Sequence, residues 1–295
     1  MLNIYEQITK NKIRSGVIVS FFVAFIIGVA LVITHAYNLD NSLLIFAFIL
    51  SLGSSFTSYF WGDKIVLTLN QAIPASRKDF FDFYTVVENL SLANQTPVPK
   101  IYVIANDAPN AFATGRDPQH AVICATTGLL ERLNRTELEG VVAHELSHIK
   151  SYDILLMTIV SVLIGSLSIL INMAYRSSFF RKNDDRDRNQ ANTIIALLGF
   201  ILIIFAPIIA QLIQLAISRR REYFADASAV KLTRQPQGLI NALTKISQDD
   251  TVLDTASTAT ASLYITNPFK GNKIASLFST HPPIEDRIKA LQAMM

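Results

Sequence analysis

The chain has 295 residues, enough for one large domain or two modest ones, and 51% of them are hydrophobic and concentrated in blocks. Its net charge is only +3, and Lys and Arg are scattered or flank the apolar blocks, which argues against a nucleic-acid-binding protein. The single cysteine, Cys124, excludes an intramolecular disulfide framework and agrees with a reducing compartment.

Residues 1–61 contain two uncharged apolar runs, 16–33 and 42–61, each near the length that a helix needs to cross a bilayer. The first run could be a signal peptide, but no small-residue cleavage pattern follows it. We therefore predict two membrane-spanning helices joined by a short loop. The loop has no Lys or Arg, whereas both outer flanks do, which predicts a cytoplasmic N-terminus and a cytoplasmic location for the residues after Trp61. The flanking basic residues are Lys10, Lys12, Arg14, Lys64, Arg77 and Lys78.

Residues 62–153 have the character of a soluble domain. The segment 110–115 is interpreted as an edge strand or a loop beside the helix that follows. Cys124 lies in an apolar, strand-like run, and we interpret it as a buried packing residue and not as a ligand. The other predicted elements are a helix over 80–92, strands over 100–104 and 121–125, and a helical turn over 128–132.

Residues 141–149 contain the pattern H-E-x-x-H in an apolar, helix-forming context. In an α-helix His144 and His148 lie one turn apart on the same face, while Glu145 is turned by roughly 100° about the axis. Two imidazoles and a carboxylate suit Zn²⁺ with one position left for a water, from which Glu145 could take a proton as general base. Thr136 and Glu139 are interpreted as the capping box that starts this helix. The competing interpretation is a chance match on an ordinary amphipathic helix.

Two further apolar runs, 154–174 and 194–217, are also long enough to span a bilayer. Their connection, residues 175–192, carries five basic and three acidic residues, which conflicts with an external loop under the positive-inside rule. The three arginines at 219–221 favour a hairpin that returns to the cytoplasmic side. Pro207 predicts a kink in the fourth run. Whether this hairpin crosses fully or packs partly within the protein stays open.

A metal ion held by two histidines and a water needs a third protein ligand. Glu222 and Asp226 follow the fourth apolar run, and their spacing puts both carboxylates on one helix face. We predict that Glu222 is the ligand and that Asp226 accepts a hydrogen bond from the second ring nitrogen of a ligating histidine. Asp153 is a second candidate for such a supporting role. The alternative is that Glu222 only pairs with the preceding arginines at a helix start.

The C-terminal part contains one more concentration of possible chemistry, His281 with Arg287 six residues on. A histidine near the metal could hydrogen-bond the oxyanion of a tetrahedral intermediate. Equally, His281 could lie in a surface turn, with Arg287 paired to Glu285 or Asp286. The other elements predicted here are helices over 221–232, 237–247 and 284–295 and a Thr-, Ser- and Ala-rich stretch over 251–262.

As a set, these motifs resemble the HtpX-type membrane zinc metalloproteases, which are relatives of the CaaX prenyl proteases. The resemblance covers essentially the whole chain. It includes the paired N-terminal runs, H-E-x-x-H before an apolar hairpin, Arg-Glu-Tyr-Phe-Ala-Asp at 221–226, and His281-Pro282 with Arg287. The chain length and the four apolar runs are similar to the bacterial heat-shock members and not to the longer prenyl proteases. The basic connection at 175–192 fits this topology worst.

The resemblance implies a mostly α integral membrane protein with a small β-sheet, about four transmembrane helices and a cytoplasmic gluzincin-type metalloprotease domain. The predicted organisation is a transmembrane hairpin (1–62), a first catalytic part with the H-E-x-x-H helix (63–153), a second hairpin (154–217) and a second catalytic part with the third ligand (218–295).

The resemblance also implies a function and a set of site residues. One Zn²⁺ per chain would serve an endopeptidase of the bacterial inner membrane that cleaves misfolded or damaged membrane proteins or unfolded polypeptides in quality control. No oligomeric state follows from it. The implied residues are His144, His148 and Glu222 as zinc ligands, Glu145 as general base, Asn110 as the residue that binds the substrate backbone, and His281 and Arg287 at the reacting carbonyl.

Two other classes of protein compete with this interpretation, beside a protease of the prenyl-protein type. A non-catalytic scaffold or chaperone would normally close a structural zinc site with a fourth ligand, often a cysteine, and Cys124 is the only one in the chain. A transporter or channel would carry charged residues within its spans, and the four apolar runs contain none.

Overall fold

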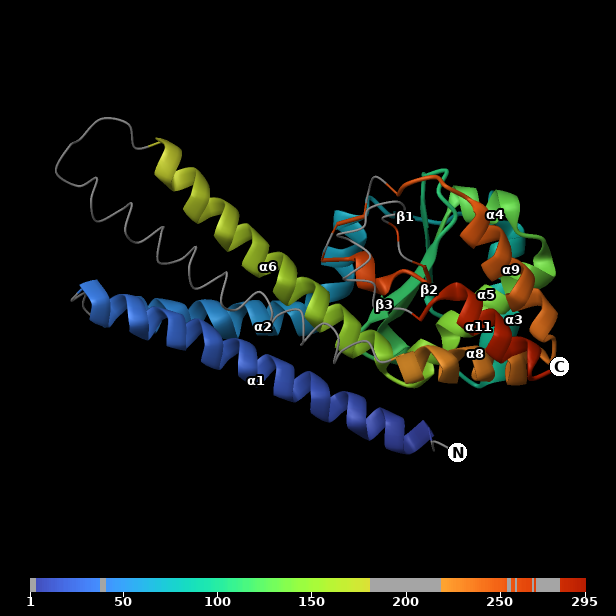
Figure 1. Ribbon diagram of the computed structural model, residues 1–295, viewed down its shortest axis with the longest axis horizontal. Coiled ribbons are helices and arrows are strands. Elements are labelled where there is room, and N and C mark those ends of the chain that lie inside the picture. Colours follow the sequence, from blue (N-terminus) through green and yellow to red (C-terminus); the bar gives the residue numbers. More distant parts are fainter. Residues whose placement is uncertain are drawn as a thin grey trace.

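Figure 1 shows a computed structural model of the chain, in which three long helices extend away from the part that holds the β-sheet. The structure describes residues 4–37, 41–180, 219–253, 256–257, 259–266, 268 and 282–295. The helices are α1 (Ile4–Tyr37), α2 (Ser42–Leu69), α3 (Phe81–Asn94), α4 (Thr127–Arg132), α5 (Arg135–Lys150), α6 (Asp153–Phe180), α8 (Arg219–Thr233), α9 (Pro236–Gln248) and α11 (Ile284–Gln292). The strands are β1 (Ile73–Pro74), β2 (Lys100–Ile104), β3 (Ala111–Gly115) and β4 (Ala121–Thr126), and the 3₁₀ helices are η1 (Pro118–His120) and η2 (Ala261–Leu263).

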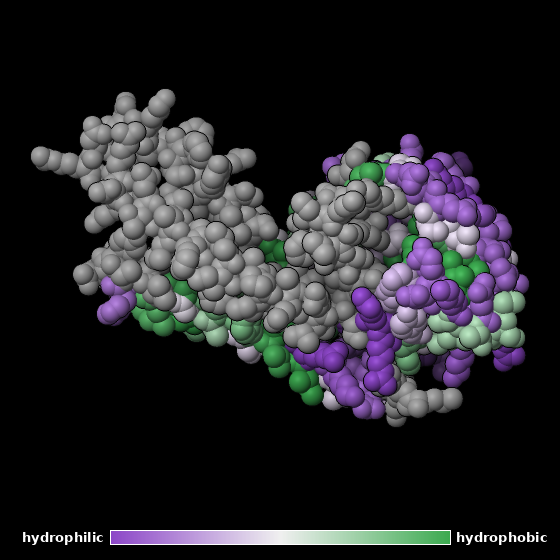
Figure 2. All heavy atoms as spheres, viewed as in Figure 1, coloured by the Kyte–Doolittle hydropathy of each residue, from purple (hydrophilic) through white to green (hydrophobic). Residues whose placement is uncertain are grey.

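Helices α1 and α2 are both long and apolar enough to cross a membrane. Their 34 and 28 residues exceed the roughly 20 that a bilayer requires. Large apolar side chains of α2 point outward, and Ile45, Phe46 and Ile49 are each more than 60% exposed. In Figure 2 hydrophobic residues lie along the lower edge of the left half, where α1 runs, whereas hydrophilic residues prevail over the coloured part of the right half. The protein is therefore a membrane protein.

Helix α6 is the third long helix, and it leaves α5 at an angle of 83°. The bend lies at Tyr152, whose φ of 61° is left-handed and interrupts the helical hydrogen-bond ladder. Counted as one bent span, α5 and the first part of α6 raise the number of candidate spans among the described residues from two to three. The predicted fourth span (194–217), Pro207 and residues 181–192 of the basic connection lie outside the described residues.

The β-sheet has four strands in the order β1-β2-β4-β3. The central pair, β2 and β4, is parallel, and the two outer pairs are antiparallel. All six residues of β4 are buried, and the Cys124 thiol in it packs among apolar side chains that raise its pKa by excluding water. Strand β3, built from the segment predicted as edge strand or loop, lies at one edge of the sheet.

Helix α5 starts with a capping box, but not the predicted one. Asn134 Oδ1 accepts a hydrogen bond from the Glu137 amide at 3.0 Å, and Glu137 Oε2 accepts one from the Asn134 amide at 2.9 Å. The prediction of Thr136 with Glu139 was wrong because Asn is as good an N-cap as Thr and has its own glutamate three residues on. Glu139 instead pairs with Arg135 one turn away, at 3.6 Å.

The H-E-x-x-H helix is the centre of the domain, since α3, α8, α9 and the sheet all pack around α5. Nearly every residue from Leu138 to Ile149 is buried. Helix α9 comes into close contact with α5 at Gly140, where a Cβ would lie 2.7 Å from the backbone nitrogen of Leu239. This enclosure holds both histidines in fixed positions away from bulk water.

Candidate metal centre

The two histidines of α5 point their Nε2 atoms at a common position. His144 and His148 are one helical turn apart, their ring centroids are 4.7 Å apart, and their Nε2 atoms are 3.1 Å apart. Both side chains are buried. Two imidazoles that converge in this way can share one cation as ligands.

Helix α8 brings Glu222 to the same position. Its carboxylate oxygens lie 3.6 Å from His144 Nε2 and 3.6 Å from His148 Nε2. Ligand atoms about 2.1 Å from a tetrahedral Zn²⁺ would be about 3.4 Å from one another. The three observed separations bracket that value, so these residues fit a tetrahedral metal ion. Among the described residues, His144, His148 and Glu222 are the group of side chains that could hold one.

A carboxylate orients each histidine from the far side of its ring. Asp226 Oδ1 lies 2.9 Å from His144 Nδ1, and Asp153 Oδ2 lies 3.1 Å from His148 Nδ1. A proton held on each Nδ1 leaves the Nε2 lone pair free for a metal ion. Asp226 reaches His144 because it lies one turn after Glu222 on α8.

The electrostatics of the centre favour a positive charge between these groups. Burial disfavours protonation of His144, but hydrogen bonds with Asp226 and Glu222 outweigh it and raise the pKa of His144 to about 9. A metal cation at Nε2 would take the place of that proton. The same carboxylates that stabilise the imidazolium would therefore stabilise the ion.

Arg287 of α11 lies against this cluster and is fully buried. Its Nε and Nη2 donate to the two oxygens of Asp226 at 2.9 and 2.7 Å, and its Nη1 donates to the carbonyl of Ile265 at 3.1 Å. Burial opposes its charge, yet Asp226, Glu222 and Glu145 hold the pKa of Arg287 above its ordinary value. The structure thus pairs Arg287 with Asp226 across helices and not with the neighbouring Glu285 or Asp286 considered from the sequence.

Two more residues contact Asp153, and neither was predicted to belong to the site. Asn11 of α1 donates through Nδ2 to Asp153 Oδ1 at 2.6 Å and to the carbonyl of Ser151 at 2.9 Å. Arg221 of α8 donates to Asp153 Oδ1 at 3.0 Å. Arg221 was interpreted only as a basic flank or a partner for Glu222, and no spacing rule connects Asn11 with a residue 142 positions away.

Three residues remain from the predicted site, Glu145, His281 and Asn110. Glu145 is buried next to His144 on α5, and its negative charge contributes to the raised pKa of Arg287. His281 lies outside the described residues. Asn110 is buried immediately before β3, where its Nδ2 donates to the carbonyl of Thr266 at 3.1 Å and its Oδ1 accepts from the Ala111 amide.

The outer edge of β3 is occupied by the chain itself. The Ile265 amide donates to the carbonyl of Ala111 at 2.9 Å, and Tyr264 forms an antiparallel bridge with Phe112. The two aromatic rings are in edge contact, with centroids 5.1 Å apart. Residues 264–266 therefore lie where an added strand would pair with β3.

A buried His-His-Glu cluster on two crossing helices, with a glutamate next to the first histidine and two candidate spans attached, defines a membrane-bound metalloprotease. The chain belongs to the M48 peptidases, because residues 82–295 match the family described as Peptidase family M48.

Relatives of nearly the same length carry the name "Protease HtpX homolog". The one from Dictyoglomus turgidum is 42% identical over 290 residues, which cover 98% of this chain and 94% of the relative. The one from Ligilactobacillus salivarius is 42% identical over 296 residues, which cover 99% and 100%. A crystal structure of S. mikatae Ste24p aligns with 97% of this chain and 67% of its own, with 20% identity and a TM-score of 0.49. The predicted membership in the HtpX group of metalloproteases is confirmed by the two relatives.

Proposed function

We propose that this protein is a zinc-dependent endopeptidase of the bacterial inner membrane that cleaves misfolded or damaged membrane proteins at the cytoplasmic face. The convergence of His144, His148 and Glu222 on one position beside Glu145 carries the proposal. A gluzincin-type domain held by about four transmembrane helices is part of it.

The ligand chemistry supports zinc. Two imidazole nitrogens and one carboxylate oxygen are the donor set of catalytic zinc sites, which keep one position open. A structural site would need a fourth protein ligand, and the cluster found in the described part of the chain has three members. The buried Cys124 packs in another apolar cluster. These observations favour an enzyme over a scaffold with a structural metal.

Glu145 is proposed as the general base. Zn²⁺ at the centre would supply a Lewis acid that polarises the peptide carbonyl and lowers the pKa of a coordinated water. Glu145 accepts the proton of the attacking water and passes it to the leaving amine. His281 is proposed as a hydrogen-bond donor to the reacting oxygen. Arg287 adds positive charge at the centre. Its hydrogen bonds to Asp226 also fix the carboxylate that orients His144.

Asn110 and strand β3 are proposed to bind the substrate backbone in an extended conformation. For this, residues 264–266 must leave the edge of β3, because the Ala111 carbonyl is already engaged by Ile265. Asn110 would exchange its bond to the Thr266 carbonyl for one to the substrate. The edge is therefore shielded from unselected polypeptides until a substrate competes for it.

The membrane helices support the proposed location and the proposed class of substrate. Basic residues on the outer flanks of the first two runs support a cytoplasmic catalytic part, and the relatives named above are bacterial. Helix α5 turns directly into α6, so the metal centre lies next to a long apolar helix. A substrate that protrudes from the bilayer can reach such a site.

The substitution Glu145→Gln tests the proposal directly. It removes the base but no metal ligand, so we expect zinc content to stay near one per chain while cleavage of casein and of a misfolded membrane protein falls roughly 100-fold or more. Metal analysis and a gel-based cleavage assay in detergent provide the two readouts. A chelator should abolish wild-type cleavage, and added zinc should restore it.

The matched control is Glu139→Gln, because Glu139 lies on the same helix in a partly exposed pair with Arg135. We expect this variant to cleave like the wild type. Proteolysis retained by Glu145→Gln would refute the proposed base. Zinc binding by a wild-type protein that cleaves neither substrate would favour the scaffold.

A further inference from the structure

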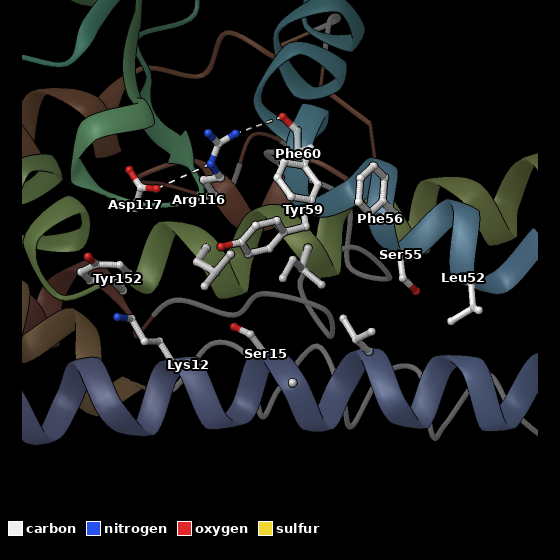
Figure 3. A pocket seen from close by; sticks show the side chains of 14 residues that line it. Lys12, Ser15, Leu52, Ser55, Phe56, Tyr59, Phe60, Arg116, Asp117 and Tyr152 are labelled. Carbon is white, nitrogen blue, oxygen red and sulfur yellow. Dashed lines mark hydrogen bonds and ion pairs between the residues drawn. The ribbon is translucent and has the colours of Figure 1, made fainter.

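A cavity of about 700 Å³ lies outside the metal centre, between α1, α2 and the first turns of α6. Figure 3 shows that α1 forms one wall and α2 the opposite one, with the Arg116–Asp117 corner after β3 closing one end. None of the residues that line it is a proposed metal ligand or the proposed base. Its walls belong to the two helices that are long enough to span a membrane.

The cavity is polar at one end and apolar at the other. Lys12, Tyr152 and Arg116 gather at the polar end, and the Tyr59 hydroxyl points toward it in Figure 3. Leu52 and Phe56 line the opposite end together with Ser55, whose hydroxyl donates to the Ser51 carbonyl at 2.8 Å. Along α2, Tyr59 and Leu52 are seven residues apart, which corresponds to about 10 Å along a helix. A ligand with a polar head and an apolar tail matches this gradient.

The polar end carries excess positive charge. The Lys12 ammonium lies 4.4 Å from the centre of the Tyr152 ring, and no described carboxylate lies within ion-pair distance of it. Arg116 stacks on the Phe60 ring at 5.5 Å and lies 3.6 Å from Asp117. Asp117 in turn accepts hydrogen bonds from two backbone amides and from a histidine ring in its own 3₁₀ turn.

We propose that this cavity binds an anionic phospholipid, with its phosphate between Lys12 and Arg116 and an acyl chain along Leu52 and Phe56. Basic side chains next to membrane helices attract anionic headgroups, and aromatic residues prefer the same interfacial depth. A membrane helix is a less suitable occupant. An apolar helix would leave the Lys12 ammonium at the polar end without a counter-charge.

The experiment titrates the full-length protein, purified in a neutral detergent, with phosphatidylglycerol and separately with phosphatidylcholine. Native mass spectrometry measures the fraction of protein with one bound lipid. We expect phosphatidylglycerol to bind more tightly, and the pair Lys12→Gln with Arg116→Gln to weaken it roughly tenfold to thirtyfold. Binding of phosphatidylcholine should change by less than threefold.

The matched control is the pair Arg14→Gln with Lys64→Gln, which removes two exposed charges from α1 and α2 outside the cavity. It should bind phosphatidylglycerol like the wild type. Since Lys12 is exposed and Arg116 partly exposed, their variants should melt like the wild type, and Lys12→Gln alone gives a milder second test. The proposal would be overturned if the control pair lost as much affinity, or if both lipids bound equally well. Comparable binding of glycerol phosphate without acyl chains, or displacement of the lipid by an apolar helical peptide, would also overturn it.

Discussion

At the scale of single residues, the metal centre depends on the carboxylates that contact the Nδ1 atom of each imidazole. Asp226 bonds the Nδ1 of His144, and Arg287 fixes both oxygens of Asp226. The orientation of a side chain on α5 is thus set by residues of α8 and α11. Because all these groups are buried, a change in one of them is transmitted to the metal position without being screened by water.

The substitution Asp226→Asn should therefore act on metal binding. The amide keeps the size of the side chain but loses the charge that fixes the Nδ1 proton of His144. We expect the metal affinity to fall about 10- to 100-fold, measured by competition with a chromogenic chelator. Asp250→Asn, at an exposed position, should bind metal like the wild type. An Asp226→Asn affinity within twofold of the wild type would contradict the supporting role.

Contacts within one helix of the site were predictable from the sequence, whereas contacts between helices were not. A spacing of four residues predicts which side chains share a helix face, and it identified His144 with His148 and Glu222 with Asp226. The contacts of Arg287 and Asn11 join different helices, so they depend on packing angles that no local spacing encodes. A buried arginine or asparagine differs from an exposed one only in those contacts.

At the scale of elements, α5 and α9 cross in close contact at Gly140. A methyl group there would meet the backbone of Leu239, which cannot rotate away as a side chain can. We expect Gly140→Ala to destabilise the protein by about 1–3 kcal/mol, measured by chemical unfolding in detergent. Gly53→Ala in α2 is the control: nothing lies within 4 Å of its Cβ position, and alanine should be neutral or stabilising.

Residues 264–266 cover the edge of β3. The Tyr264 hydroxyl anchors this segment by donating to Asn70 Oδ1 at 2.8 Å. Under the proposed function, Tyr264→Phe loosens the segment by about 1 kcal/mol, so cleavage of unfolded polypeptide should rise up to about fivefold. Tyr84→Phe removes a comparable bond, to the Ala75 carbonyl, away from this edge, and its activity should not rise. Unchanged cleavage in a folded Tyr264→Phe protein would mean that the segment does not restrict access.

The longer elements were largely predictable, because their hydrophobic residues recur with a clear period, whereas β1 and the two 3₁₀ helices were not predicted. Strands over 100–104 and 121–125 and the H-E-x-x-H helix all occur, as β2, β4 and α5. The pairing of residues 264–266 with β3 was not predictable. The segment contains no strand-length pattern, and a contact between residues about 150 positions apart depends on tertiary packing that no local period encodes.

At the scale of the whole molecule, the membrane helices and the metal centre form one connected structure. Helix α1 packs along α6, and its Asn11 reaches the turn between α5 and α6 that follows His148. Arg221, which follows the predicted second hairpin, donates a hydrogen bond to Asp153 directly after this turn. Asn11 and Arg221, which lie on either side of α5 in the sequence, therefore meet at Asp153, and α1 has a role beyond anchoring.

The substitution Asn11→Ala tests this connection. It removes the donor to the Ser151 carbonyl and to Asp153, both of them buried, so we expect a loss of about 1–3 kcal/mol in unfolding free energy. Because Asp153 orients His148, metal affinity should also fall several-fold, whereas an anchor alone would leave it unchanged. Thr9→Ala, an exposed polar position on the same helix, is the control for both measurements. Normal metal affinity in a destabilised Asn11→Ala protein would limit Asn11 to helix packing and separate the membrane anchor from the metal centre.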